Sequence, residues 1–170
     1  MLRQLAIALL ALANVAHATE APSESVDAKI DAIATRASQL ATRTFGKSAS
    51  FCSEQQLPAH VQMNERLAQD VATIATATHD ALVEMVRVDP TFLETMPAIH
   101  EEELAAGDRQ GDELLRMAHA DPLIGCSTLA TSLAPHTVED FKADLLASFK
   151  GRAATRAKHC AATPRPADCP

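Results

Sequence analysis

Apolar residues recur along most of this 170-residue chain at the spacing of one helix face. From Val26 they follow steps of four and three residues, which predicts a helix over about 25–45 that Gly46 ends. A second stripe from Leu67 to Val88 predicts a longer helix, beginning near Pro58 and ending before Asp89. Its length leads us to expect a bend or break within 72–78.

Shorter periodic segments follow Pro90, and they predict four further helices. The last one opens with Thr137-Val-Glu-Asp140, which resembles a capping box, and its apolar stripe ends at Phe149. No segment alternates with period two, so no sheet is predicted. The pattern therefore predicts an all-α fold, a single-domain helical bundle of about five to six helices. The four later ranges are about 97–106, 108–120, 122–133 and 137–160.

One internal similarity has two interpretations. DALVEMVRVDP at 80–90 recurs as DELLRMAHADP at 112–122, and helical repeat proteins have periods close to this. A third copy is absent. We therefore interpret each copy as an amphipathic helix that ends before Asp-Pro, where Asp caps the next helix and Pro occupies its first turn. An incipient repeat is the alternative.

Residues 1–18 have the pattern of a signal peptide. Arg3 precedes an apolar run that is too short to span a bilayer, and Ala16 and Ala18 form an A-x-A cleavage pattern. We expect cleavage to leave 19–170 as a single helical domain with a Pro-containing tail over about 161–170. The expected location is periplasmic or secreted, with no membrane insertion after cleavage.

Four cysteines in an exported chain are expected to form two disulfides. Three pairings are open from the sequence alone. We expect Cys160 to pair with Cys169, because the Pro-containing segment between them can turn back on itself, and Cys52 to pair with Cys126. The predicted bundle is thus disulfide-stabilised.

The net charge of −7 disfavours nucleic acid and anionic membranes as partners, since both require a surplus of Lys and Arg. The acids concentrate in 80–121. A solvated surface is the simplest interpretation of such a segment, and an acidic face for a basic protein partner is the functional one. The residues expected to bind that partner are Glu101, Glu102, Glu103, Asp108 and Asp112.

Motifs for catalysis are missing from the sequence. His100-Glu-Glu-Glu-Leu104 lacks the second histidine of a zinc-protease helix, and no nucleophile elbow occurs. Met with His is a plausible copper or haem ligand set, which gives an alternative site at Met96, His100, Met117 and His119. Against it, Met117 fits the buried stripe of its helix, where Met commonly fills a core. We expect no cofactor.

These observations favour an exported, non-enzymatic interaction protein, such as an inhibitor, an immunity protein or a small adaptor, with an acidic face for an unknown, basic protein partner. The alternative is a metal- or haem-binding helical bundle with Met and His ligands. The chain contains no Trp and no Tyr, which disfavours a carbohydrate-binding module because such sites rely on flat aromatic side chains.

Overall fold

The computed structural model describes residues 25–56, 60–95, 99–133, 136–162 and 164. These residues form helices and no strand, which confirms the predicted all-α bundle. In chain order the helices are α1 (Val26–Glu54), α2 (Met63–Val88), α3 (Phe92–Thr95), α4 (Glu101–Ala120), α5 (Pro122–Ser132) and α6 (Val138–Cys160).

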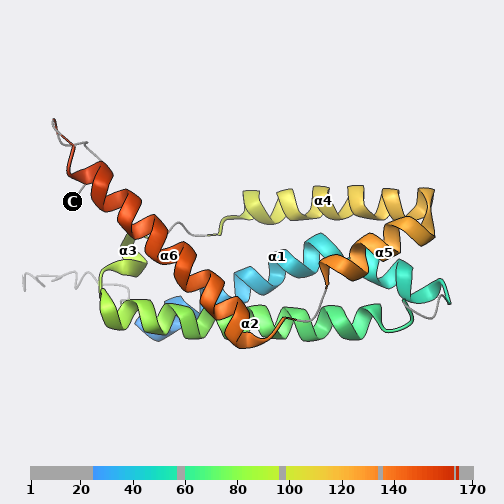
Figure 1. Ribbon diagram of the computed structural model, residues 1–170, viewed down its shortest axis with the longest axis horizontal. Coiled ribbons are helices and arrows are strands. Elements are labelled where there is room, and N and C mark those ends of the chain that lie inside the picture. Colours follow the sequence, from blue (N-terminus) through green and yellow to red (C-terminus); the bar gives the residue numbers. More distant parts are fainter. Residues whose placement is uncertain (1–24, 57–59, 96–98, 134–135, 163, 165–170) are drawn as a thin grey trace, which may run out of the picture.

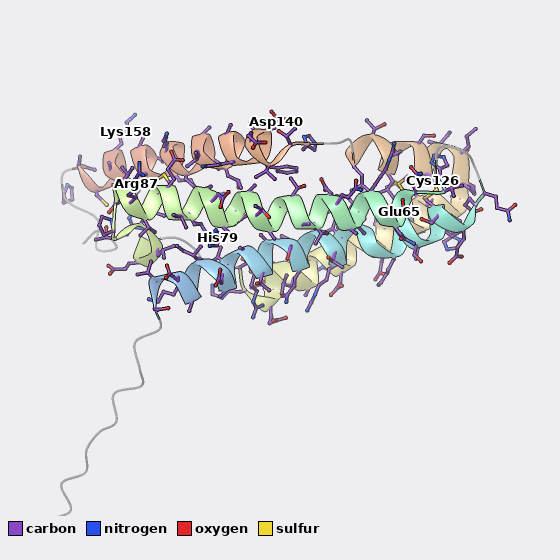
Figure 2. The ribbon with its side chains drawn as sticks, turned by 90° about the horizontal axis from the view of Figure 1, so that it is seen from below. Glu65, His79, Arg87, Cys126, Asp140 and Lys158 are labelled. Atoms are coloured by element: carbon purple, nitrogen blue, oxygen red, sulfur yellow. A yellow bond between two sulfur atoms is a disulfide. The ribbon has the colours of Figure 1, made fainter. Side chains whose placement is uncertain are left out.

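The bundle is built on α1 and α2, which pack against each other over most of their length (Figure 1). Helix α4 lies on α1 and runs in the same direction, whereas α2 runs in the opposite direction. Helix α5 folds back from the end of α4 and contacts both α4 and α1. Helix α6 packs on α2, and Figure 2 shows it following α2 from Asp140 towards Lys158. An ion pair of 3.3 Å between Lys142 and Glu84 joins these two helices.

Two apolar clusters form the core. One lies at the end where α1, α2, α4 and α5 meet, and it contains the Cys52–Cys126 disulfide, which confirms the pairing predicted for these two cysteines. The other joins α1, α2, α3 and α6 around Ile30, Leu82 and Phe149. Cys169 lies outside the described residues, so its pairing with Cys160 stays a prediction.

The prediction that Gly46 ends the first helix was wrong. Helix α1 continues to Glu54, because Ser48, Ala49 and Cys52 are buried in its last two turns. Their burial and the disulfide outweigh the cost of about 1 kcal/mol for a glycine inside a helix. The chain leaves the helical conformation at Gln56, whose φ of 50° lies in the left-handed region.

The two short helices predicted over 97–106 and 108–120 are one helix, α4, which passes through Gly107. Gly107 and Gly111 mark the closest approach of α4 to α1. A Cβ at position 107 would lie 2.7 Å from Leu40 Cδ1, and one at position 111 would lie 2.5 Å from the carbonyl oxygen of Arg43. These glycines therefore serve close helix packing and do not end a helix.

The other helix predictions hold with small changes. Helix α2 begins at Met63, later than expected, and is continuous through 72–78, where a bend or break was predicted, so there is no break. Helix α3 was not predicted. Thr137 accepts a hydrogen bond from the backbone N–H of Asp140, which confirms the capping box of α6. Among the described helices, none is long and apolar enough to cross a membrane.

Candidate functional site

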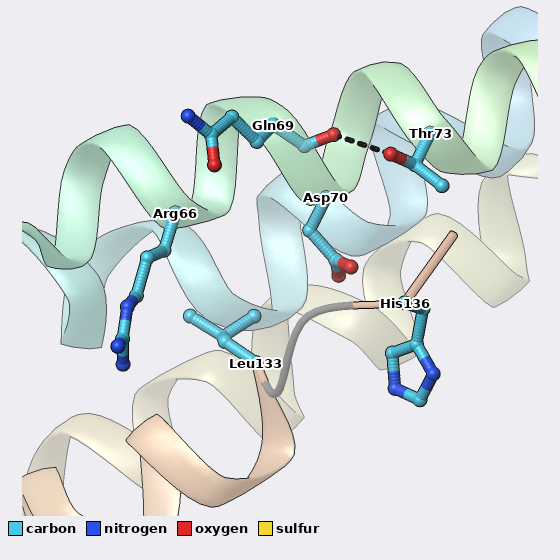
Figure 3. Close-up of a pocket in the computed structure, with 6 residues that line it drawn as sticks. All are labelled: Arg66, Gln69, Asp70, Thr73, Leu133 and His136. Atoms are coloured by element: carbon cyan, nitrogen blue, oxygen red, sulfur yellow. Dashed lines mark hydrogen bonds between the residues drawn. The ribbon is translucent and has the colours of Figure 1, made fainter. Parts of the chain in front are cut away.

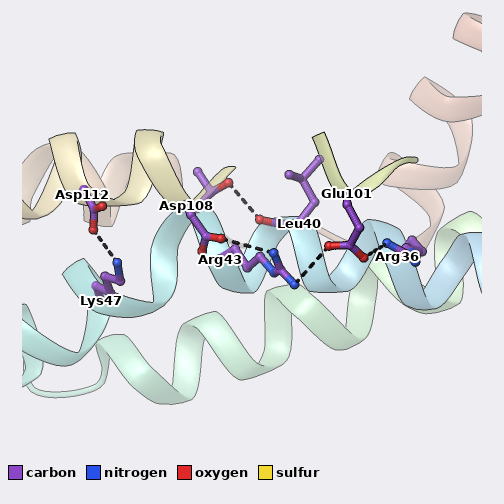
Figure 4. Close-up of polar contacts among 8 residues, drawn as sticks. Arg36, Leu40, Arg43, Lys47, Glu101, Asp108 and Asp112 are labelled. Carbon is purple, nitrogen blue, oxygen red and sulfur yellow. Dashed lines mark hydrogen bonds and ion pairs between the residues drawn. The ribbon is translucent and has the colours of Figure 1, made fainter. Parts of the chain in front are cut away.

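A row of ion pairs connects α4 to α1 (Figure 4). Arg36 Nη1 lies 2.6 Å from Glu101 Oε1, Arg43 Nη1 lies 3.2 Å from Asp108 Oδ2, and Lys47 pairs with Asp112. Arg43 also approaches Glu101, with 3.8 Å between Nη2 and Oε2. We call the Arg36–Glu101, Arg43–Asp108 and Lys47–Asp112 pairs the charge ladder.

The partners of every pair in the charge ladder are 65 residues apart in the sequence. A constant offset means that the two helices run parallel and in one register. Successive pairs are seven and four residues apart on each helix, which places all three on one face. The charge of Asp112 and its hydrogen bond raise the pKa of Lys47, consistent with a lysine held in its charged form.

The structure thus gives most of the predicted partner-binding acids a role inside the molecule. Glu101, Asp108 and Asp112 belong to the charge ladder, while Glu103 accepts a hydrogen bond of 2.8 Å from the backbone N–H of His100 at the start of α4. Glu102 is exposed and has no polar partner among the described residues. Binding of a partner by these five residues stays a prediction.

The structure does not bring together those of the alternative Met and His ligands that it describes. Met96 lies outside the described residues. His100 precedes α4, whereas Met117 and His119 lie near its other end, about 25 Å away at 1.5 Å per residue. The His119 ring packs on Phe51, with 4.2 Å between the ring centroids. In the described part of the chain, no group of three or more His, Cys, Asp or Glu side chains could hold a metal ion.

A polar pocket of about 310 Å³ opens between α2 and the ends of α5 and α6 (Figure 3). Arg66, Asp70 and Thr73 line it from one face of α2, and Leu133 and His136 line it from the other side. Burial raises the pKa of the Asp70 carboxyl, and the positive charge of His136 opposes that shift.

The polar pocket presents an acid and an imidazole, and no hydrogen bond joins them among the described residues. The His136 ring packs edge-on against Phe141, with 4.7 Å between the ring centroids. The lining offers a carboxyl, an imidazole and a guanidinium to a small polar molecule. This pocket could not be predicted from the sequence, because its two sides are far apart in the chain and match no motif.

A second pocket, mostly apolar and of about 260 Å³, lies where α4 turns into α5. Exposed apolar side chains line it or adjoin it: Ile124 and Met117 line the pocket and are 66% and 43% exposed, and Leu123, which precedes Ile124 in α5, is 63% exposed. We call this pocket and these three residues the α4–α5 corner. The prediction that Met117 belongs to the buried stripe was wrong, because Ala118 is the residue of this turn that enters the core.

Ser48 of α1 borders the pocket of the α4–α5 corner. It is 1% exposed, and its hydroxyl has no hydrogen-bond partner in the part of the chain that the structure describes. Gly125 shapes the pocket from the α5 side, because a Cβ there would lie 2.5 Å from the Cα of Ala118, so the two helices touch backbone to backbone. A buried hydroxyl without a partner is costly, and few occur in folded proteins.

The α4–α5 corner was difficult to predict from the sequence. Its apolar residues have the same spacing as core residues, so their exposure depends on which face α5 turns to α4. No family model, characterised protein or solved structure matches this chain.

Proposed function

We propose that this chain is an exported, non-enzymatic interaction protein that docks its partner through the α4–α5 corner. The observation that carries the proposal is the exposure of Met117 and Ile124, which line one apolar pocket, and of Leu123 next to Ile124 in α5. Scattered exposed apolar side chains are normal, whereas a contiguous group beside a pocket is typical of a binding surface.

The negative charge of the chain supports a basic protein as the partner. The chain has a net charge of −7, and the charge ladder leaves Glu102 unpaired among the described residues, so the bundle keeps an acidic field. Such a field speeds the approach of a cationic protein, while apolar contacts hold the complex together. The partner is therefore a protein segment with apolar side chains flanked by Lys or Arg. This keeps the basic partner predicted from the sequence and moves its main contact to another surface.

Two observations support export. Residues 1–18 have the pattern of a signal peptide, and the Cys52–Cys126 disulfide is a bond that persists in oxidising compartments. A periplasmic or secreted location follows as part of the proposal. Fractionation of cells that express the full chain, with blotting of each fraction, would measure it.

The docking surface is tested by two variants that place glutamine on different surfaces, one removing apolar side chains and the other removing negative charges. One carries Leu123→Gln and Ile124→Gln at the α4–α5 corner, and the other carries Glu101→Gln, Glu102→Gln and Glu103→Gln. Gln at position 124 is the third residue of α5, where it suits a capping box with Asp121, so this helix should keep its start. Circular dichroism checks that both variants fold.

Each protein is immobilised and used to retain partners from the native periplasm or culture medium, with quantification by mass spectrometry. We expect the corner variant to lose a protein that the wild type and the triple Gln variant both retain. Retention by the corner variant with loss by the triple Gln variant would overturn the proposal and restore the acidic residues as the docking surface.

A further inference from the structure

The pocket of the α4–α5 corner has the size of a site for one aromatic ring. Its volume is about 260 Å³, and Leu114, Met117, Ala120 and Leu129 contribute apolar lining. A closed apolar cavity of roughly 150 Å³ is sufficient to bind benzene. The pocket therefore has the volume that one substituted ring needs.

Ser48 gives the pocket a polar end. Its hydroxyl is buried and has no partner among the described residues, although a serine hydroxyl can both donate and accept a hydrogen bond. An occupant with a hydroxyl on its ring would supply the missing partner once the side chains that cover Ser48, which is 1% exposed in the free protein, shift to let it reach the serine hydroxyl. A purely apolar occupant would leave the serine hydroxyl unpaired, at a cost.

Arg116 adds a third feature at the mouth. Its Nε and Nη2 donate hydrogen bonds of 2.9 and 2.5 Å to the two carboxylate oxygens of Glu113, so its guanidinium is held in one orientation while it lines the pocket. A planar guanidinium stacks well on the face of an aromatic ring. Apolar walls, a hydroxyl at one end and a fixed guanidinium at the mouth together suit a phenol ring.

We propose that this pocket receives a tyrosine side chain of the docked partner, with its hydroxyl bonded to Ser48 and its ring beside Arg116. This inference rests on the proposed function. The partner must supply the ring, because the chain itself contains no Tyr and no Trp. Tyrosine is also among the side chains that contribute most binding energy at protein interfaces.

The apolar rim favours a protein residue over a free phenolic molecule. Leu123 and Ile124 are exposed beside the pocket, and Leu123 does not line it. A free phenol would fill the pocket and leave these residues in water. A protein that inserts one ring would cover them as well, and residues around an anchor commonly exclude water in this way.

The test measures binding of two probes to the whole folded protein with its disulfides intact. N-acetyl-tyrosinamide and N-acetyl-phenylalaninamide differ by one hydroxyl group, and both are titrated while amide shifts are followed by ¹H–¹⁵N NMR. We expect shifts at Ser48, Met117, Gly125 and Thr128, and several-fold tighter binding of the tyrosine probe. A site with a buried hydrogen-bonding group discriminates against an analogue that lacks the matching group.

Three variants sharpen the test. Ser48→Ala should keep the fold and abolish the preference for the tyrosine probe, because it removes only an unpaired hydroxyl. Ala120→Phe should block both probes by filling the pocket from its exposed side. Ala153→Phe, on the exposed part of α6, is the matched control and should leave binding unchanged.

Equal binding of the two probes, or a tyrosine preference that survives Ser48→Ala, would overturn the assignment of tyrosine. Shifts confined to other parts of the protein would overturn the pocket itself. Either result, combined with loss of the partner by the Leu123→Gln and Ile124→Gln variant, would leave the docking surface in place with a different anchor. Partner retention by that variant would instead overturn the proposed function.

Discussion

The two ends of α4 differ in how their conspicuous residues are used. The half that begins at Glu101 is strongly acidic, yet its acids mostly contact cations of α1 or the backbone of their own helix. The other end, around Met117, is much less conspicuous in the sequence. There the apolar side chains are exposed, and a pocket lies between them.

This difference shows that a cluster of like charges in the sequence is a poor guide to a binding surface. Each acid of the charge ladder meets a cation 65 residues earlier in the chain, and only the packing of α4 on α1 brings the two together. Exposed apolar residues give the stronger indication of function, because leaving them in water contributes nothing to the stability of the fold.

Removing the Cys52–Cys126 disulfide should have the largest effect on the difference between the two ends of α4. The bond links α1 to α5 across a sequence separation of 74 residues, so replacing both cysteines with Ala should lower the free energy of unfolding by about 4 kcal/mol. Hydrogen exchange should then rise mainly in α5 and at the end of α1, while the half of α4 with the charge ladder changes little. Uniform loosening of all helices would contradict a separate role for the two ends.

Gly111→Ala tests the packing that holds the charge ladder together. The new Cβ would lie 2.5 Å from the carbonyl oxygen of Arg43, so α4 must move away from α1. We expect a loss of about 2 kcal/mol in the free energy of unfolding, measured by urea denaturation, as is usual when a packed contact is overfilled.

Gly151→Ala is the matched control for this substitution. Apart from its chain neighbours and the nearby backbone of its own helix, no described atom lies within 4 Å of the position of its Cβ, so the same change should stabilise α6 by up to about 1 kcal/mol through helix propensity. Equal effects of the two substitutions would mean that α4 does not pack closely on α1.

The charge ladder itself should contribute little per pair. Arg36 and Glu101 are 39% and 70% exposed in their side chains, and exposed pairs are usually worth about 0.2–1 kcal/mol. A double-mutant cycle with Arg36→Gln and Glu101→Gln should give a coupling energy in that range, and salt should reduce it. A coupling energy indistinguishable from zero at low salt would show that the charge ladder does not stabilise the position of Glu101.

The smallest effect is expected at Asp70, in the polar pocket away from both ends of α4. Its carboxyl has a raised pKa in the folded state. The free energy of unfolding therefore falls as pH rises above the unfolded pKa of about 3.9. Asp70→Asn removes this penalty. Its melting temperature should exceed that of the wild type at pH 7, and the difference should shrink towards pH 3. A difference that is constant between these pH values would contradict the raised pKa.

Helix content was predictable from the sequence because it depends on local spacing and caps. Thr137 with Asp140, and Asp121 with Pro122, mark helix starts that the structure contains. Glycines were harder to interpret, because a helix was expected to end before Gly46 and before Gly107, yet both lie within helices. Gly107 lies within a helix because α1 approaches it, and a contact between distant segments leaves no local pattern.

The candidate site was less predictable than the fold. Exposure of Ile124 depends on the angle between α4 and α5, which the contact of Gly125 with Ala118 determines. The unpaired hydroxyl of Ser48 is visible only after three helices have packed around it. In contrast, the Cys52–Cys126 pairing was predicted correctly, because covalent chemistry left few alternatives.

The most direct test of the central claim is covalent footprinting of the complex with the partner. Hydroxyl radicals label exposed apolar side chains, and carbodiimide coupling labels exposed carboxylates, in the free protein and in the complex. We predict that Met117, Leu123 and Ile124 lose reactivity in the complex, while Glu102 and Val26, which are also exposed, keep theirs. Protection of Glu101, Glu102 and Glu103 with unchanged labelling of Met117 and Ile124 would contradict the account.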